Sequence, residues 1–304
     1  MSRKPFVVAC VPAFNEEKTI AKVVLLAQKH VDKVVVCDDG SSDLTGEIAK
    51  SLGAELIRHE RNLGYGAAIQ SLFRRARELD VDVMVTLDAD GQHDPGEIPL
   101  LVEPVLEGKA DVVVGSRFLV DSGKTNSVPR YRRFGIKAIT GLTGAASKSG
   151  VSDAQSGFRA YGRKALDGLR LNEKGMGVSV EVLMEAEKQG LTVVEVPIKC
   201  IYRGIEKPST HDPLSHGAGV VMSILRLVVE DRPLLFLGVP GVLSLLVGMV
   251  FGVWMLQTYA LEHQIPTNVA LASIAFILIG LFAVFTAITL YAISRLVHKT
   301  NNRH

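Results

Sequence analysis

Short apolar runs alternate with helical periodicity along the first 118 residues of the chain. Runs typical of buried parallel strands occupy residues 6–12, 33–39, 54–59, 82–88 and 111–117. Between the first two runs, apolar residues recur at helical spacing from Ile20 to Ala27, and a second helical pattern covers residues 66–79. This alternation predicts a doubly wound, mostly parallel α/β sheet, whose ligands bind beyond the carboxyl ends of the strands.

The pattern changes after about residue 119. Residues 119–134 have a loop-like composition, and helical periodicity returns at 136–148 and around 178–189. A strand-like run then covers residues 192–203. We expect these elements to complete the same α/β domain, which would extend from residue 1 to residue 204.

Two long uncharged stretches follow in the C-terminal part of the chain. Residues 234–256 and 269–294 contain no charged residue, and each stretch exceeds the roughly 20 residues that a helix needs to cross a bilayer. We therefore expect a transmembrane hairpin within residues 233–304, preceded by an amphipathic, interfacial segment over residues 205–232. Gly248 and Gly252 form a G-x-x-x-G pair, which suits packing within the hairpin or between the subunits of a homo-oligomer.

Charge is distributed unevenly around this hairpin. The link at residues 257–268 contains no Lys or Arg, whereas basic residues flank both spans, at Arg226, Arg232, Arg295, His298, Lys299 and Arg303. The positive-inside rule predicts that the N-terminal domain and the C-terminal tail are cytoplasmic. The net charge of the whole chain is +2, which gives no indication of a nucleic-acid partner. The three cysteines, Cys10, Cys37 and Cys200, lack metal or redox spacing.

The candidate chemistry begins in the stretch L-D-A-D-G-Q-H-D-P, residues 87–95. If the preceding strand continues through it, Asp88 and Asp90 project to the same side. Two carboxylates at that spacing repel each other unless a cation lies between them, and oxygen ligands suit Mg²⁺ or Mn²⁺. A solvated turn is the alternative interpretation. The pair Asp38–Asp39 and Arg117 also stand at predicted strand ends, which favours a functional site.

Five local motifs then occur in one order: V-P-A-F-N-E-E (11–17), D-D-G-S-S-D (38–43), D-A-D-G-Q-H-D-P (88–95), G-S-R-F (115–118) and Q-S-G-F-R-A-Y (155–161). Together they resemble the inverting, nucleotide-sugar-dependent glycosyltransferases that have a GT-A fold. The resemblance is strongest to the branch of dolichol-phosphate mannose synthases and polyprenyl-phosphate glucosyltransferases. It covers residues 5 to about 205, and a C-terminal hairpin also occurs in that branch.

The resemblance implies roles for the nucleotide and metal residues. The nucleotide would be lined by Pro12, Phe14, Glu16, Asp38, Asp39 and Asp88. The family usually has Tyr at position 14, so this chain would lose a hydroxyl contact there. The metal, Mg²⁺ or Mn²⁺, would be held by Asp88, Asp90 and Gln92. Asp90 and Arg117 are the residues expected to act most directly in catalysis.

The resemblance also implies an acceptor site. The acceptor phosphate would be bound by Arg117, Arg130, Arg132, Arg133 and Arg203, and the sugar and acceptor would meet Gln155, Ser156 and Arg159. Guanidinium groups suit phosphate oxygens. Two alternatives stay open: the arginines at 130–133 could contact anionic lipid head groups, and the 155–161 motif could be a structural turn with an aromatic residue packed inward.

The implied reaction moves a hexose from UDP-glucose, UDP-N-acetylglucosamine or GDP-mannose to dolichyl or polyprenyl phosphate, for glycan or N-glycoprotein assembly. A lipid phosphate is already anionic, so no strong general base is needed. A polysaccharide synthase would usually carry Q-x-x-R-W, yet the single tryptophan, Trp254, lies in the first span. A sugar-nucleotide pyrophosphorylase would begin with a Gly-rich loop instead of V-P-A-F-N-E-E. A membrane-anchored binding partner without activity leaves the carboxylate pair and the arginines unexplained.

Overall fold

The computed structural model describes residues 3–119, 151–199 and 233–301, with side chains to residue 293. The chain divides into two compact units, Met1–Ile224 and Leu225–His304. The first contains the predicted α/β domain and the second contains the predicted hairpin.

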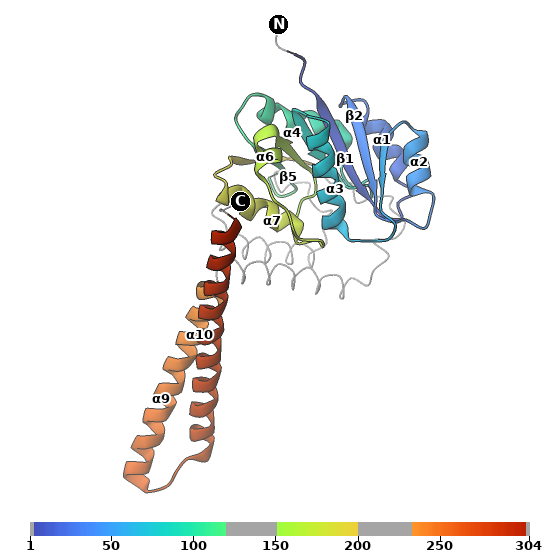
Figure 1. The fold of residues 1–304 in the computed structure, drawn as a ribbon. Coiled ribbons are helices and arrows are strands. Elements are labelled where there is room, and N and C mark those ends of the chain that lie inside the picture. Colours follow the sequence, from blue (N-terminus) through green and yellow to red (C-terminus); the bar gives the residue numbers. More distant parts are fainter. Residues whose placement is uncertain (1–2, 120–150, 200–232, 302–304) are drawn as a thin grey trace. The chain divides into compact units, whose positions relative to one another are not determined.

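The α/β unit is built on one sheet with helices around it (Figure 1). The sheet has seven strands in the order β3-β2-β1-β4-β6-β5-β7. Strand β6 runs antiparallel to β4 and β5, whereas the other pairs of neighbouring strands are parallel. The strands are β1 Val7–Ala13, β2 Lys33–Asp38, β3 Glu55–Arg58, β4 Val83–Thr86, β5 Val112–Ser116, β6 Arg159–Gly162 and β7 Val193–Pro197.

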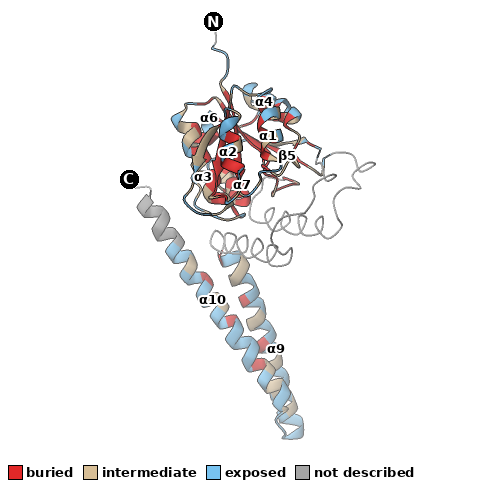
Figure 2. Cartoon of the chain, turned by 90° about the vertical axis from the view of Figure 1, so that its right-hand side faces the viewer, coloured by how far each residue is buried: buried red, intermediate tan, exposed pale blue. Residues whose placement is uncertain are grey.

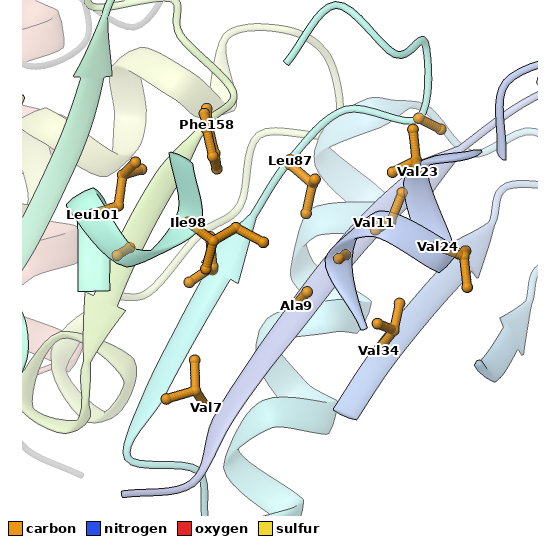
Figure 3. Packing of buried hydrophobic residues seen from close by; sticks show 14 of the residues in the cluster. Val7, Ala9, Val11, Val23, Val24, Val34, Leu87, Ile98, Leu101 and Phe158 are labelled. Atoms are coloured by element: carbon orange, nitrogen blue, oxygen red, sulfur yellow. The ribbon is translucent and has the colours of Figure 1, made fainter. Parts of the chain in front are cut away.

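Helices cover both faces of this sheet, because β1 sends alternate apolar residues to each side. Val7, Ala9 and Val11 belong to one buried cluster, shown in Figure 3, which packs against α1 Ile20–Ala27, α2 Thr45–Ser51 and α4 Ile98–Leu106. Val8 and Cys10 belong to a second cluster, under α3 Tyr65–Glu78, α6 Arg163–Gly168 and α7 Val178–Lys188. A short 3-10 turn, η1 Pro95–Glu97, leads into α4.

Within the described residues, the predicted strands and helices of the α/β unit are confirmed with two corrections. The predicted helix at 136–148 and the predicted interfacial segment at 205–232 lie outside the described residues. Strand β6, which lies between β4 and β5, was not predicted. It is four residues long and begins with an arginine, so it lacks the apolar run that identifies the other strands. The expected extension of β4 to Asp88 is wrong: the strand ends at Thr86, and the carboxylates lie in the turn beyond it.

The C-terminal unit is a pair of long helices. A π-helical turn, η2 Leu234–Gly238, precedes α9 Val239–Glu262, and α10 covers Thr267–Asn301. The segments Leu234–Glu262 and Thr267–Ile293 are long and apolar enough to cross a membrane, with mean hydropathies of 2.4 and 2.6. Figure 2 shows that most of their surface is exposed. Large apolar side chains on that surface suit a lipid environment.

Small residues let the two helices approach each other closely. A Cβ atom on Gly248 would lie 2.7 Å from Ile277 Cγ1, and one on Gly252 would lie 3.2 Å from Ser273 Oγ. The Ser273 hydroxyl donates a 2.8 Å hydrogen bond to the carbonyl of Gly248. Of the two expectations for the G-x-x-x-G pair, packing within the hairpin is the one that the structure shows.

Candidate active site

The loops that follow β1 and β2 are joined at the carboxyl edge of the sheet. The backbone N–H of Asn15 donates to Ser41 Oγ at 2.9 Å, and the backbone N–H of Ser42 donates to the Asn15 side-chain oxygen, Oδ1, at 2.9 Å. Asn15 adopts a left-handed conformation with φ 56°, which Asn tolerates better than most residues. The amide of Glu16 donates to Thr45 Oγ1 at 2.7 Å. These bonds bring the first two sequence motifs into one rim.

The predicted nucleotide residues on this rim differ in accessibility. Pro12 is buried within β1, whereas Phe14 and Glu16 are half-buried. Asp38 is fully buried; its Oδ1 accepts the Ser41 amide at 2.9 Å, and its Oδ2 lies 3.3 Å from Arg58 Nε. Burial raises the pKa of the Glu16 carboxyl, and the negative charges of Asp90, Asp43 and Asp88 raise it further, against the Thr19 hydroxyl bond.

Asp39 is almost completely used by the protein itself. It is 3% exposed, and its Oδ1 accepts the Leu63 amide at 2.9 Å while its Oδ2 accepts the Gly64 amide at 2.8 Å. His59 Nδ1 lies 2.6 Å from the same Oδ1. A role for Asp39 in nucleotide binding stays a prediction, and its observed contacts fix the loop between β3 and α3.

The carboxylate pair lies just beyond β4. Asp88 and Asp90 are half-buried while Ala89 between them is fully buried, so the two carboxylates keep the expected alternation although they lie beyond the strand. Asp88 Oδ1 accepts a 3.1 Å hydrogen bond from the Tyr65 hydroxyl, and Asp90 Oδ1 accepts a 2.9 Å hydrogen bond from the backbone N–H of Gln92. Burial raises the pKa of the Asp88 carboxyl, which the Tyr65 bond and the charges of two arginines only partly oppose.

His93 is a buried, neutral member of this turn. Its ring packs on Phe158 with centroids 5.2 Å apart, and its Nδ1 accepts the Asp88 amide at 3.4 Å. Burial lowers the pKa of the imidazole well below its ordinary value. A neutral ring that accepts through Nδ1 carries its proton on Nε2. His93 therefore supports the Asp88 backbone.

The oxygen atoms of this turn fit a hard divalent cation. Asp88 and Asp90 offer carboxylates and Gln92 offers an amide oxygen, the ligand types that Mg²⁺ and Mn²⁺ prefer. Burial raises the pKa of the Asp88 and Glu16 carboxyls and so disfavours their ionised forms. A nearby cation would favour the ionised forms and lower these pKa values. Within the described ranges no group of three or more His, Cys, Asp or Glu residues could hold a metal.

Arg117 is committed to an ion pair with a buried aspartate. Its Nε lies 2.6 Å from Asp153 Oδ2 and its Nη2 lies 2.7 Å from Asp153 Oδ1, a two-pronged arrangement. The Asp153 amide in turn donates to Glu195 Oε1 on β7 at 3.0 Å. This chain of contacts holds Arg117 at the end of β5, close enough that its charge lowers the pKa of the Asp88 carboxyl. Binding of the acceptor phosphate by Arg117 stays a prediction.

The 155–161 motif is largely internal. Arg159 is 2% exposed, and its guanidinium donates to the carbonyls of Ser156, Ser179 and Ala154 at 2.7–2.8 Å. Ser156 is buried, and Gln155 is half-buried. Phe158 and Tyr161 pack into the two cores, as the structural alternative for this motif expected. The sugar and acceptor roles of Gln155, Ser156 and Arg159 stay predictions.

Gly157 explains why this motif lies next to the carboxylates. A Cβ atom at this position would come within 2.6 and 2.7 Å of the two Asp88 carboxylate oxygens and within 2.8 Å of the Tyr65 hydroxyl. The backbone of residue 157 therefore forms one wall around Asp88, and only glycine leaves room for it. The four remaining arginines predicted to bind the acceptor, Arg130, Arg132, Arg133 and Arg203, lie outside the described residues.

Sequence reasoning missed four side chains that organise this site: Tyr65, His59, Asp153 and Glu195. Tyr65 reaches Asp88 from the first residue of α3. Asp153 lies two residues before the 155–161 motif, but nothing local tied it to Arg117. Their partners lie far along the chain, so no spacing rule could reveal them. For Tyr65 alone there was a local signal, because a polar aromatic residue at the start of a helix that follows a strand can reach the carboxyl edge of the sheet.

The chain was compared with known proteins. Residues 8–170 match the model of glycosyl transferase family 2. A UDP-N-acetylglucosamine–dolichyl-phosphate N-acetylglucosaminyltransferase of Methanococcus voltae is 36% identical over 63% of this chain and 84% of that protein. A dolichyl-phosphate hexose transferase of Haloferax volcanii is 33% identical over 72% of this chain and 92% of that protein.

A solved structure shows the same architecture. Glucosyl-3-phosphoglycerate synthase from Mycobacterium tuberculosis, in complex with Mn²⁺ and UDP-glucose, superposes with a TM-score of 0.55 at 25% identity, over 74% of this chain and 79% of that one. The predicted GT-A fold, with its mostly parallel sheet, is confirmed. The family match covers the strand ends at which the candidate residues gather. The chain is a glycosyltransferase and belongs to glycosyl transferase family 2.

Proposed function

We propose that this glycosyltransferase moves a hexose from a nucleotide-sugar to dolichyl or polyprenyl phosphate. The observation that carries the proposal is the half-buried carboxylate pair Asp88–Asp90 at the carboxyl edge of the sheet, close enough to Glu16 on the neighbouring rim that its charge raises the pKa of the Glu16 carboxyl. Relatives that act on dolichyl phosphate support the choice of acceptor. The two helices that are able to span a bilayer support it as well, because such an acceptor resides in the membrane.

In the proposed reaction an oxygen of the lipid phosphate attacks the anomeric carbon of the sugar. The bond from that carbon to the donor diphosphate breaks, the nucleoside diphosphate leaves, and the anomeric configuration inverts. The nucleophile is already an anion, so placement and partial desolvation matter more than a general base. Arg117, held rigidly by Asp153, is the described cation that we assign to the acceptor phosphate.

We assign a divalent cation, Mg²⁺ or Mn²⁺, to Asp88, Asp90 and Gln92. When bound, it would neutralise charge that develops on the departing diphosphate. The Tyr65 hydroxyl and the Gly157 backbone fix the Asp88 carboxylate from two sides, so this ligand would be in place before the donor arrives. A solved relative with the same fold contains Mn²⁺ together with UDP-glucose, which supports a metal-assisted transfer.

The proposed topology follows from the hairpin and the charges around it. The catalytic domain, residues 1–204, and the C-terminal tail would be cytoplasmic, and residues 205–232 would lie at the membrane surface. The hairpin, residues 233–304, would keep the domain beside the lipid substrate. Labelling of an introduced cysteine in the 257–268 link by a membrane-impermeant reagent, in intact cells, checks this orientation.

The reaction is tested with the purified full chain in detergent. The chain is incubated with dolichyl phosphate, Mg²⁺ or Mn²⁺, and a panel of UDP- and GDP-sugars, and nucleoside diphosphate release is measured with and without the lipid. We expect lipid-dependent release with one donor, and loss of release in Asp90→Ala. Release that ignores the lipid but responds to a free saccharide would instead indicate a saccharide acceptor. Absence of release with every donor would reject transfer altogether.

A further inference from the structure

A short chain of polar contacts lies behind Asp39. His59, which directly follows β3, has its Nδ1 2.6 Å from Asp39 Oδ1 and its Nε2 2.9 Å from Ser71 Oγ on α3. The His59 side chain is 10% exposed and that of Asp39 is 4% exposed. A carboxylate can only accept a hydrogen bond, so Nδ1 carries a proton and donates it. The imidazole is therefore held on both sides, between the sheet and α3.

The same Asp39 carboxylate organises the loop that follows His59. Its oxygens accept the backbone amides of Leu63 and Gly64 at 2.9 and 2.8 Å. Gly40 adopts φ 75°, and a Cβ atom there would collide with the backbone of Arg61. The loop between His59 and Gly64 thus lies directly against the Asp39–Gly40 turn, at the carboxyl end of β2, and its own side chains at residues 61–63 are exposed.

This loop leads straight to the carboxylate pair. Gly64 is followed by Tyr65, whose hydroxyl donates to Asp88 Oδ1 at 3.1 Å, and the Gly66 amide donates to the carbonyl of Lys174 at 2.8 Å. Residues 59–65 therefore connect Asp39, on the nucleotide side of the site, with Asp88, on the metal side. Any tilt of the Asp39 carboxylate would change the position of this whole segment.

We propose that His59 is a positioning residue for the nucleotide: clamped between Asp39 and Ser71, it fixes the Asp39 carboxylate and the 61–64 loop as one wall of the nucleotide pocket. The inference rests on the proposed function, because it takes Asp39 and its surroundings as the nucleotide side of the site. His59 itself has no contact with the reacting atoms. Its effect reaches the donor through the orientation of Asp39 and through the loop.

The test measures nucleotide binding directly, so that it does not depend on transfer. UDP and GDP are titrated by calorimetry, with Mg²⁺, into the full chain in detergent. In His59→Ala we expect about tenfold weaker binding of whichever diphosphate the native chain binds, the effect of losing one hydrogen bond to a charged group. His59→Asn keeps a donor towards Asp39, and it should recover most of the affinity. His30→Asn, at an exposed histidine after α1, is the matched control and should bind as the native chain does.

Kinetics separate positioning from general damage to the fold. His59→Ala should raise the KM for the nucleotide-sugar about tenfold, with kcat and the KM for the lipid phosphate within about twofold of native values. Ser71→Ala, which removes only the second contact of the ring, should shift the donor KM in the same direction by a smaller factor.

Three results would overturn the inference. The first is unchanged diphosphate affinity in a folded His59→Ala protein, as judged by its melting curve. The second is a lower kcat together with raised KM values for both substrates, none of which His59→Asn restores, since that pattern indicates only a structural role. The third is a native chain that binds neither UDP nor GDP. By contrast, a native chain that binds a diphosphate but forms no lipid-linked sugar would reject the proposed acceptor. The diphosphate titration of His59→Ala would then still decide the role of His59.

Discussion

Acidic residues stand at both edges of the sheet, but they meet different partners there. At the amino edge, Asp32 accepts the Val7 amide and pairs with Lys4, and the Lys4 bond holds the pKa of the Asp32 carboxyl below its ordinary value. Asp82 accepts the Phe6 amide, which likewise lowers the pKa of its carboxyl. At the carboxyl edge, burial raises the pKa of the Asp88 and Glu16 carboxyls.

The difference shows which edge the fold satisfies by itself. Each amino-edge aspartate directly precedes a strand and captures a backbone amide, so it stabilises the sheet as an ionised group. At the carboxyl edge Asp38 and Asp39 are also paired within the protein, but Glu16 and Asp88 carry charges that the described side chains compensate only partly. An arrangement that is unfavourable for the empty protein is typical of a site that binds a cation or substrate.

The largest expected effect distinguishes the two edges by activity. Asp88→Asn should lower the rate of lipid-linked sugar formation by about 10²–10³-fold, because the proposed metal loses a charged ligand that acts on the developing negative charge. Asp82→Asn, the matched change at the amino edge, should leave the rate nearly unchanged. Initial rates at saturating donor and lipid check both. Equal losses of rate in the two variants would remove the functional distinction between the edges.

A second prediction concerns the wall around Asp88. Gly157→Ala should destabilise the domain by about 1–3 kcal/mol, as overpacking does, and it should also lower activity because the new methyl group displaces the Asp88 carboxylate. Gly168→Ala is the control, since the nearest atom to its added Cβ would be 4.0 Å away. Chemical denaturation and initial rates measure the two effects. If Gly157→Ala keeps the stability and activity of the native chain, the structure around Asp88 accommodates the added methyl group without cost.

The amino edge should control the acid stability of the domain. Asp32 and Asp82 have lower pKa values in the folded chain than their ordinary value of 3.8. Their contribution to the free energy of unfolding is therefore complete above that value and is lost as the pH falls through the folded-state pKa. Asp32→Asn should lower the Tm at pH 7 by about 2–4 °C, and the difference from the native chain should shrink below pH 4. A constant difference down to pH 2 would contradict this account.

The smallest expected effect, at Glu16, is an increase in stability where the other substitutions decrease stability or activity. The folded-state pKa of Glu16 is raised, so the stability linked to its protonated form is lost as the pH rises through that pKa. Glu16→Gln keeps an acceptor for the Thr19 hydroxyl but carries no charge, and it should raise the Tm at pH 7 by about 1 °C. The gain should disappear near pH 4, where Glu16 is protonated in the native chain. A lower Tm for the variant at pH 7 would mean that the carboxylate is stabilising.

Local pattern was enough to predict most of the sheet. Buried parallel strands are continuous apolar runs, so β1, β2, β4 and β5 could be read directly from the sequence, and the acids that follow them were placed at the correct edge. The alternation around Ala89 was also predictable, although the strand itself ends at Thr86. These features depend only on neighbouring residues.

Contacts between distant residues could not be predicted in the same way. Arg159 resembled a ligand-binding arginine, yet its guanidinium is enclosed by carbonyls of Ala154, Ser156 and Ser179. Arg117 was expected to bind the acceptor phosphate, which stays a prediction, but its ion pair with the distant Asp153 could not be foreseen from the motif. Which protein groups surround an arginine depends on the tertiary fold, and motif spacing carries no information on them.

The antiparallel insertion of β6 has a consequence for the order in which the domain can mature on the ribosome. Thr86 on β4 pairs with Arg159 on β6, and β5 reaches β4 only through this later strand. Strands β1 to β4 can therefore associate while the rest of the chain is still being synthesised, but the sheet stays open at β4 until β6 emerges. The wall at Gly157 arrives with the same segment. The surroundings of the candidate carboxylates Asp88 and Asp90 should thus be completed late in biosynthesis, when nearly all of the α/β domain has been made.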